Sequence, residues 1–297
     1  EFYLFEADER GNITTRPQDR AGYMDVSPLD RGEDVRREIS LTLSSMNIQP
    51  ERSHHERGPG QNKIDFHRAD PLTSADHQVA FHNAVRTIAS RYGLRASFMP
   101  KPLPEEIGNA FQMNLSLYRD RNNLFRMDAG ELCEEARFAI AGVLNRLADM
   151  TLFLNPIPNS YDRLTDDDAP NRVCWSTARG RNALRLPLPQ HRFARLQVAS
   201  PDPTCNAYLV YALLIRAALE GIANREPLPE SVGRDWHNAP VLPESLPEAI
   251  QRTRESAFIT RSLPATVVNA FVLGGEKLLR LDRQDKTSLF QKQFERF

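Results

Sequence analysis

Apolar positions recur along the chain with two periods, one typical of strands and one typical of helices. A short apolar run predicts an opening strand over residues 1–5. Apolar residues three or four positions apart predict helices over residues 30–46 and 74–92, with Asp30 as the cap of the first and Gly93 as the stop of the second. The positions expected to face inward are Val35, Ile39, Leu43 and Met46 in the first helix, and Val79, Val85 and Ile88 in the second.

The rest of the chain mixes both periods without a regular alternation of strand and helix. The predicted strands lie at 96–99, 111–117, 172–176, 183–186 and 193–198. Helices are predicted over 130–150, 206–224, 246–258 and from 265 to the end. Five prolines and little periodicity predict a long surface connection over 225–247. The pattern therefore indicates an α+β protein with a mixed or antiparallel sheet.

Charge and cysteine content narrow the class of protein. Lys plus Arg is 38 against 39 Asp plus Glu, so no net field attracts nucleic acid or an acidic membrane. A mean hydropathy of -0.51 and the lack of an apolar run near twenty residues argue against a membrane span. The chain opens on an apolar strand without a basic signal sequence, and its three cysteines are widely spaced. We therefore expect a cytoplasmic protein with reduced thiols.

The segment His54-His55-Glu56, with Lys63 seven residues after the glutamate, points most directly to chemistry. It resembles the HHE-x-x-x-GQ-x-E segment of glutamine synthetases, in which both glutamates bind one catalytic metal. Other blocks follow in the order of that family's catalytic domain: Glu1 to Phe5, Tyr23-Met24-Asp25, Pro28-Leu29-Asp30, Phe98 to Pro102, Asn155-Pro156, Asn159-Ser160-Tyr161, Arg163-Leu164, Ala169-Pro170, Trp175-Ser176, Arg185-Leu186-Pro187, Pro201-Asp202-Pro203 and Asn206 to Leu209. By these blocks the chain is identified as a member of the glutamine synthetase family.

The resemblance implies a fold, a domain plan and a set of partners. The expected fold is α+β, with a curved, mainly antiparallel sheet and flanking helices. We expect a catalytic core over residues 1–225 and an extension of the same domain over 226–297, and we do not expect the family's smaller N-terminal domain within this chain. Self-association into a ring is implied, with a small carboxylate and an amine as ligands and with neither nucleic acid nor membrane as partner.

In the family, two Mg²⁺ or Mn²⁺ ions hold ATP and glutamate while a γ-glutamyl phosphate forms, and ammonia then displaces the phosphate. By resemblance, Glu1 and Glu56 stand at two ligand positions of the first metal, and Lys63 stands at the third. Gln112 and Gln197 stand at ligand positions of the second metal. These metals prefer anionic oxygen ligands, and a charged ammonium offers no lone pair. We therefore expect metal binding to be weak or absent.

Other family positions are partly retained. Arg163 matches a substrate-side arginine and Arg185 a phosphate-side arginine, so both join Glu56 as candidate catalytic residues. Ala199 replaces an arginine of the substrate pocket, and Gly180 aligns with a phosphate-binding arginine, although either neighbour could substitute for it. The remaining candidates are Ser116, Asn114, Arg192 and Trp175 on the nucleotide side, and Gly108 and Asp168 on the substrate side.

Several of these residues have a purely structural alternative. His54 and His55 can be ordinary strand histidines, and the Asp166–Asp168 run can be a solvated loop. Trp175 can belong to the core or to the wall of the nucleotide pocket. Lys63 can point to solvent, but we expect the turn before it to bring its ammonium to Glu1 and Glu56 as a substitute for the metal.

Two functions follow from the resemblance. The first is a degenerate family member with weak or absent glutamine synthesis and a structural or regulatory role. The second is an active ATP-dependent ligase that joins ammonia or another amine to a glutamate-like acid through an acyl phosphate. We favour the first, because metal contacts supply much of the electrostatic stabilisation of phosphoryl transfer. The surviving arginines still favour ATP as a ligand.

Overall fold

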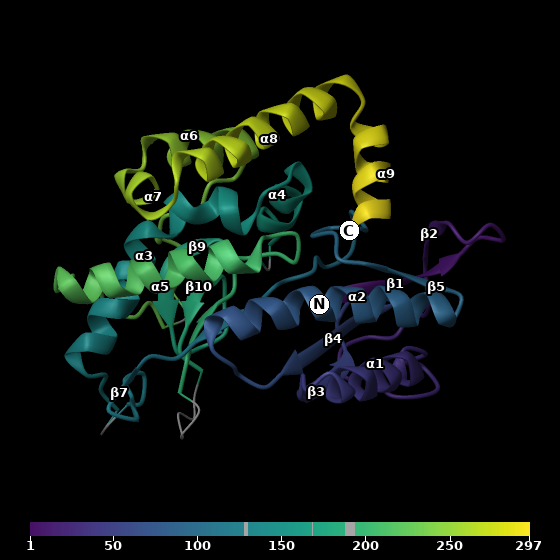
Figure 1. Cartoon of the computed structure of the whole chain (residues 1–297), viewed down its shortest axis with the longest axis horizontal. Coiled ribbons are helices and arrows are strands. Elements are labelled where there is room, and N and C mark those ends of the chain that lie inside the picture. Colours follow the sequence, from purple (N-terminus) through teal and green to yellow (C-terminus); the bar gives the residue numbers. More distant parts are fainter. Residues whose placement is uncertain (128–129, 168, 188–193, 234) are drawn as a thin grey trace. The chain divides into compact units, whose positions relative to one another are not determined.

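The computed structural model of the chain describes residues 1–127, 130–167, 169–187, 194–233 and 235–297 (Figure 1). Its contacts divide these residues into two units. The first unit comprises Glu1–Asn109 and Leu281–Phe297, and the second comprises Ala110–Arg280. Each unit has its own sheet and its own helices, so each is described separately.

The first unit is built around β1 (Phe2–Ala7), the predicted opening strand. This strand pairs antiparallel with β2 (Ile13–Pro17), β4 (Gln61–Phe66) and β5 (Leu94–Ser97). The strand β3 (Pro50–His55) pairs antiparallel with β4. Together they form a five-stranded sheet, in which β3 and β4 make the hairpin that carries the HHE segment.

Alternation along β1 explains how this sheet is covered. Phe2 and Leu4 pack into a core shared with helices α1 (Glu33–Ser45) and α2 (Pro71–Arg91). Tyr3 and Phe5 point the other way, into a smaller cluster that includes Met99 and Phe294. Phe294 belongs to the last helix, α9 (Lys286–Arg296). Successive strand residues face opposite sides of a sheet, so a run that is apolar at every position is covered on both faces.

The second unit contains a four-stranded sheet in the order β6 (Met113–Leu115), β11 (Leu196–Val198), β10 (Asn182–Arg185), β9 (Arg172–Ser176). The β9–β10 pair is parallel and the other two pairs are antiparallel. A short hairpin joins β7 (Tyr118–Arg119) to β8 (Asn122–Asn123). The helices of this unit are α3 (Glu134–Leu154), α4 (Pro158–Leu164), α5 (Ala207–Ala223), α6 (Leu246–Glu255), α7 (Ala257–Ser262) and α8 (Ala265–Gln284), the last of which extends past the boundary at Arg280.

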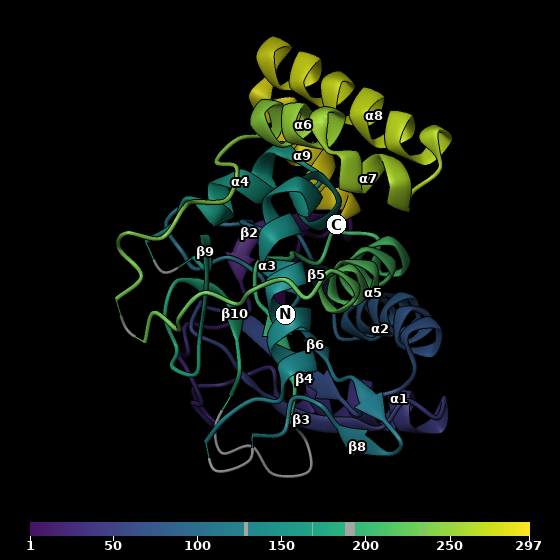
Figure 2. The ribbon, with the colours of Figure 1, turned by 90° about the vertical axis from the view of Figure 1, so that its left-hand side faces the viewer.

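Helices α3 and α5 lie against each other in the second unit (Figures 1 and 2). Their closest approach is at Gly142 and Gly221. A Cβ atom built on Gly142 would lie 2.2 Å from the carbonyl oxygen of Ala217, and one built on Gly221 would lie 2.2 Å from that of Phe138. The two helix backbones are therefore in direct contact, which only glycine allows at these positions.

The sequence prediction of an α+β fold with mainly antiparallel pairing is confirmed. Val35, Ile39, Leu43, Val85 and Ile88 are buried, as predicted. Met46 and Val79 were expected inside but are 47% and 50% exposed. The cap assigned to Asp30 is wrong, because α1 begins after Gly32 and the Asp30 side chain binds Arg36 instead. Strand β2 and helix α4 were not predicted, and the two C-terminal helices that we expected are four.

Among the described residues, no helix is both long and apolar enough to span a membrane. The domain plan with a boundary at residue 225 stays a prediction.

Candidate functional site

Strand pairing brings the first-metal positions of the family onto one face of the first unit. Lys63 on β4 lies opposite His54 on β3, and the pairing of β1 with β4 places Glu1 beside Lys63. Glu56 follows His54 by two residues, which returns it to the same face. The turn that makes this possible ends at Gly60, whose φ of +68° suits a residue without a side chain.

The ammonium of Lys63 lies between two carboxylates. Its Nζ is 3.2 Å from Glu1 Oε1 and 3.7 Å from Glu56 Oε1. Glu56 Oε1 is also 3.1 Å from His54 Nε2. The side chains of Lys63, Glu1 and Glu56 are only 13%, 9% and 14% exposed. The prediction that Lys63 faces Glu1 and Glu56 rather than solvent is therefore confirmed.

The charges in this group stabilise one another. Burial alone would lower the pKa of Lys63, but the nearby carboxylates of Glu1, Asp65 and Glu56 raise it, and the net shift is upward. Lys63 is thus a cation at neutral pH. A divalent ion would need the same carboxylate oxygens and would be repelled by the ammonium, so this donor set does not fit the family's metal.

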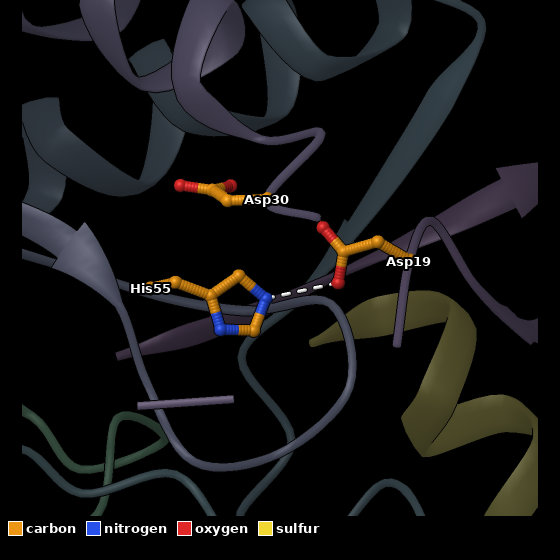
Figure 3. A group of neighbouring side chains, drawn as sticks. All are labelled: Asp19, Asp30 and His55. Atoms are coloured by element: carbon orange, nitrogen blue, oxygen red, sulfur yellow. Dashed lines mark hydrogen bonds and ion pairs between the residues drawn. The ribbon is translucent and has the colours of Figure 1, made fainter. Parts of the chain in front are cut away.

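A second group of ionisable side chains lies beside the turn between β3 and β4, where Gly60 donates to Asp19. Asp19, Asp30 and His55 are all buried and offer ligand atoms within 4.8 Å of one another (Figure 3). Figure 3 shows the His55 ring directed at the carboxylate of Asp19, with a distance of 2.9 Å between Nε2 and Oδ1. The other ring nitrogen of His55 is 2.6 Å from the carbonyl oxygen of Glu56.

These carboxylates already have partners within the protein. The two terminal nitrogens of Arg36 donate hydrogen bonds to the two carboxylate oxygens of Asp30, over 3.0 and 2.5 Å. Asp19 accepts from the backbone N–H groups of Arg31 and Gly60, at 3.0 and 2.9 Å. Because the acceptor atoms are in use and a guanidinium lies beside them, the group does not fit a divalent cation. It joins the 19–31 loop to the hairpin.

Protonation of His55 is favoured by this arrangement. Burial alone would lower the pKa of His55, but the bonds to Asp19 and to the Glu56 carbonyl raise it, and the net shift is upward. Burial alone would raise the pKa of Asp19, whereas the bonds from His55 and the Arg31 N–H lower it below its ordinary value. Both ring nitrogens can donate only when the imidazole is charged.

A loss of stability on the alkaline side should result. A group whose pKa is raised on folding contributes fully below its unfolded pKa, about 6.5 for histidine, and the contribution disappears as pH rises through the folded pKa. Urea unfolding of the wild type should therefore show a decline from neutral to alkaline pH that His55→Gln lacks. The exposed His67 provides the control, His67→Gln, which should keep the decline. Identical slopes in the wild type and His55→Gln would exclude a charged His55.

The second-metal positions that the structure describes lie in the second unit. Gln197 on β11 donates from Nε2 to Gln112 Oε1 over 3.3 Å. Arg195 and Asn114 each lie two residues from this pair, and Arg195 donates from Nε to Asn114 Oδ1 over 2.9 Å. The residues at the two ligand positions thus bind one another through neutral amides.

A cluster of positive charge lies at the end of β10. Burial lowers the pKa of Arg185, and the charges of Arg179 and Arg195 lower it further. The Nε of Arg185 is buried and has no hydrogen-bond partner among the described residues. An anion would supply an acceptor for this Nε and a charge opposite to that of the arginines.

The other predicted site residues bond mainly to backbone. Arg163 is buried and donates to the carbonyl oxygens of Ser200 and Ala199, at 2.8 and 3.2 Å. Ser116 donates to the Ala194 carbonyl, and Trp175 donates through its indole to the Pro229 carbonyl. In the first unit, the Gly108 carbonyl accepts from Gln61. Arg192 and Asp168 lie outside the described residues.

Sequence reasoning missed two groups that matter to this geometry. The contact of His54 with Glu56 was not predicted, although the spacing of two residues places both side chains on one face of an extended chain. The joining of Asp19, Asp30 and Arg36 to His55 had no local signal, because these residues meet only in the folded chain.

Comparisons with known proteins agree with this fold. Residues 1–277 match the family described as glutamine synthetase, catalytic domain. Glutamine synthetase of Clostridium saccharobutylicum is 39% identical over 287 residues, which covers 92% of this chain and 65% of that protein. The Methanosarcina mazei glutamine synthetase is 38% identical, covering 93% of this chain and 65% of its own length. This chain therefore belongs to the glutamine synthetase family and spans somewhat less than two thirds of these relatives.

Solved structures show the same similarity. A GmaS/ADP complex superposes with a TM-score of 0.85 at 27% identity, covering 96% of this chain and 68% of the other. The Plasmodium falciparum glutamine synthetase has a TM-score of 0.81 at 22% identity and covers 91% of this chain and 63% of its own, which supports the fold alone.

Proposed function

We propose that this chain is a glutamine synthetase catalytic domain in which the Lys63 ammonium replaces the first metal, so that ordinary glutamine synthesis is weak or absent. The observation that carries the proposal is the position of Lys63 Nζ, 3.2 Å from Glu1 and 3.7 Å from Glu56. A lysine can neutralise these carboxylates. It cannot coordinate phosphate oxygens and glutamate as a divalent ion does, because it has no vacant coordination positions.

The second unit supports the same proposal. Gln112 and Gln197 satisfy one another with an amide hydrogen bond. Neutral amide oxygens are weaker ligands for Mg²⁺ than the histidine and glutamate that the resemblance implies at these positions. At both sets of metal positions, the side chains therefore bind one another within the chain, where the family would bind a metal ion.

Binding of small anions is retained in this proposal. The arginine cluster at Arg185 keeps a buried unpaired donor, and a GmaS of the same fold forms a complex with ADP. We infer weak binding of ATP or a carboxylate without turnover, in a protein that assembles into a ring as the resemblance implies. Its role would then be structural or regulatory.

A coupled assay of phosphate release tests the proposal. The full-length protein is supplied with glutamate, ammonia and ATP, with Mg²⁺ or Mn²⁺, and the Clostridium saccharobutylicum relative serves as the positive control. We expect no phosphate release above background, because charge neutralisation at the transferring phosphate is lost. Release that depends on all three substrates would overturn the proposal. Release only with another acid or amine would establish the altered ligase instead.

A further inference from the structure

Residues 229–242 follow the outer edge of the second unit's sheet, and we call this segment the β9 cover (described apart from residue 234). It runs beside β9 as the yellow-green trace in Figure 2. The backbone N–H of Val232 donates to the Trp175 carbonyl over 3.2 Å, and the N–H of Val173 donates to the Pro240 carbonyl over 2.7 Å. The β9 cover therefore supplies partners to a strand at the end of its sheet, where free backbone groups need them.

Within the β9 cover, residues 236–239 form a turn that is held by two arginines. The N–H of Ala239 donates to the Trp236 carbonyl over 3.1 Å and closes the turn. The guanidinium of Arg181 lies 5.4 Å from the centre of the Trp236 ring, within range of a cation–π contact. At the other end of the turn, Arg172 on β9 donates from Nη1 to the Ala239 carbonyl over 3.3 Å.

Arg181 also holds the loop between α4 and β9, residues 165–171 (described apart from residue 168). Its Nη2 donates to the Asp166 carbonyl oxygen over 3.3 Å. The same carbonyl accepts from the N–H of Ala169 over 3.1 Å, and the N–H of Asp166 donates to the Arg163 carbonyl over 3.2 Å. A displacement of Arg181 therefore acts directly on the backbone of this loop.

The side chain of Arg181 thus stands between two segments that are far apart in the sequence. Its Nε is buried and has no hydrogen-bond partner among the described residues. A guanidinium is planar and rigid, so it loses one contact when the partner on the other side moves away. The loop and the β9 cover also bond where β9 begins, through the N–H of Leu242 and the Asn171 carbonyl over 2.8 Å, but that bond lies at the far end of the loop from Asp166.

We propose that Arg181 couples the β9 cover to the loop between α4 and β9, so that the two segments open and close as one unit. Trp236 then controls the exposure of the loop backbone through Arg181. The contacts that carry this coupling include no metal position and no ligand, so the inference goes beyond the proposed function and does not rest on it.

Native-state hydrogen exchange, measured by mass spectrometry of peptic fragments, tests the coupling. The reporters are the amides of Asp166 and Ala169 in the loop, and those of Val232 and Ala239 in the β9 cover. Trp236→Leu should make the β9 cover exchange about threefold faster, as the loss of one exposed cation–π contact allows. The loop amides should accelerate by a similar factor, while those of α5 keep their rates.

Arg181→Met completes a double-mutant cycle. This variant should accelerate exchange in both segments, and adding Trp236→Leu to it should make the loop no faster, because the connection is already broken. The matched control is Arg179→Met, which removes an exposed arginine two positions away and should change neither segment. Trp236→Phe keeps a ring face for the guanidinium, so its loop should exchange at the wild-type rate.

Acceleration of the β9 cover alone in Trp236→Leu would overturn the proposal, because the loop would then open independently. The same would follow from wild-type rates in both segments, or from a loop that Trp236→Leu accelerates equally with and without Arg181. If Arg181→Met fails to fold, equal loop rates in Trp236→Leu and Trp236→Phe would overturn it. Exchange is measured in EDTA without substrates, so this result and that of the turnover assay are independent.

Discussion

Replacing Gly221 with alanine should lower the free energy of unfolding by about 3 kcal/mol, the upper range for overpacking, because the added methyl group meets backbone rather than a movable side chain. Its Cβ would lie 2.2 Å from the Phe138 carbonyl oxygen and 2.6 Å from the Gly142 Cα. Relief of that contact requires α3 and α5 to separate. Their separation would loosen the side chains packed around the crossing. Urea denaturation followed by circular dichroism gives the measurement.

The matched control is Gly274→Ala in α8. A Cβ atom at Gly274 meets nothing within 4 Å, so only helix propensity changes, and the variant should be more stable by up to about 1 kcal/mol. A Gly221→Ala protein as stable as Gly274→Ala would mean that the two helices do not touch at this point. Gly142→Ala should reproduce the loss, because its Cβ meets the Ala217 carbonyl oxygen at the same distance of 2.2 Å.

Removal of the Lys63 charge should have a comparable effect. Lys63→Met leaves the carboxylates of Glu1 and Glu56 nearly buried without their cation, and breaking one side of such a pair costs about 3 kcal/mol. Lys292→Met removes an exposed ammonium from α9 of the same unit and should change stability little. Equal denaturation midpoints for the two variants would show that the Lys63 contacts add nothing.

The variant Lys63→Glu tests whether Lys63 occupies a metal position or only stabilises the fold. Three carboxylates then converge, which is the oxygen-rich set that Mn²⁺ binds. This variant should be unstable alone and should gain thermal stability as Mn²⁺ is added, because binding to the folded state shifts the unfolding equilibrium. The wild type, measured in the same series, should show no shift. A wild-type protein stabilised by Mn²⁺ at low concentrations would contradict the proposed function.

The sequence pattern predicted the elements that are long and strongly periodic, but it could not fix which residues they meet. Helix α1 was predicted in the right place, but Met46 was expected inside. Met46 follows the last helical residue, Ser45, and the helical period shows which face is buried but not where along the chain burial ends. Val79 lies in the middle of α2 and is exposed for another reason: it is six residues before Val85, a spacing that puts the two side chains on different faces of the helix. The short polar strand β2 has no apolar signal of its own, since it is held by the edge of β1.

In the candidate site, too, contacts set by local sequence could be predicted and contacts between distant segments could not. Lys63 was expected to face Glu1 and Glu56 because a hairpin register is set by the turn, which is local in sequence. By contrast, the sequence predicts Asp30 as a helix cap, because nothing local in it indicates that Arg36 turns back to bind this carboxylate. The contact of Trp236 with Arg181 joins residues far apart in the chain, and it becomes visible only once the sheet edge is covered.

The placement of α9 has a consequence for the order in which the protein folds during synthesis. The ring of Phe294 packs edge-on against Phe5 on β1, with 5.0 Å between their centres. All of Ala110–Arg280 is made between these two partners. During synthesis the first sheet is therefore made without the aromatic side chains of α9 that complete this cluster, and the cluster stays incomplete while the second unit is being made. Until α9 is made, the ring of Phe5 lacks its cover by Phe294.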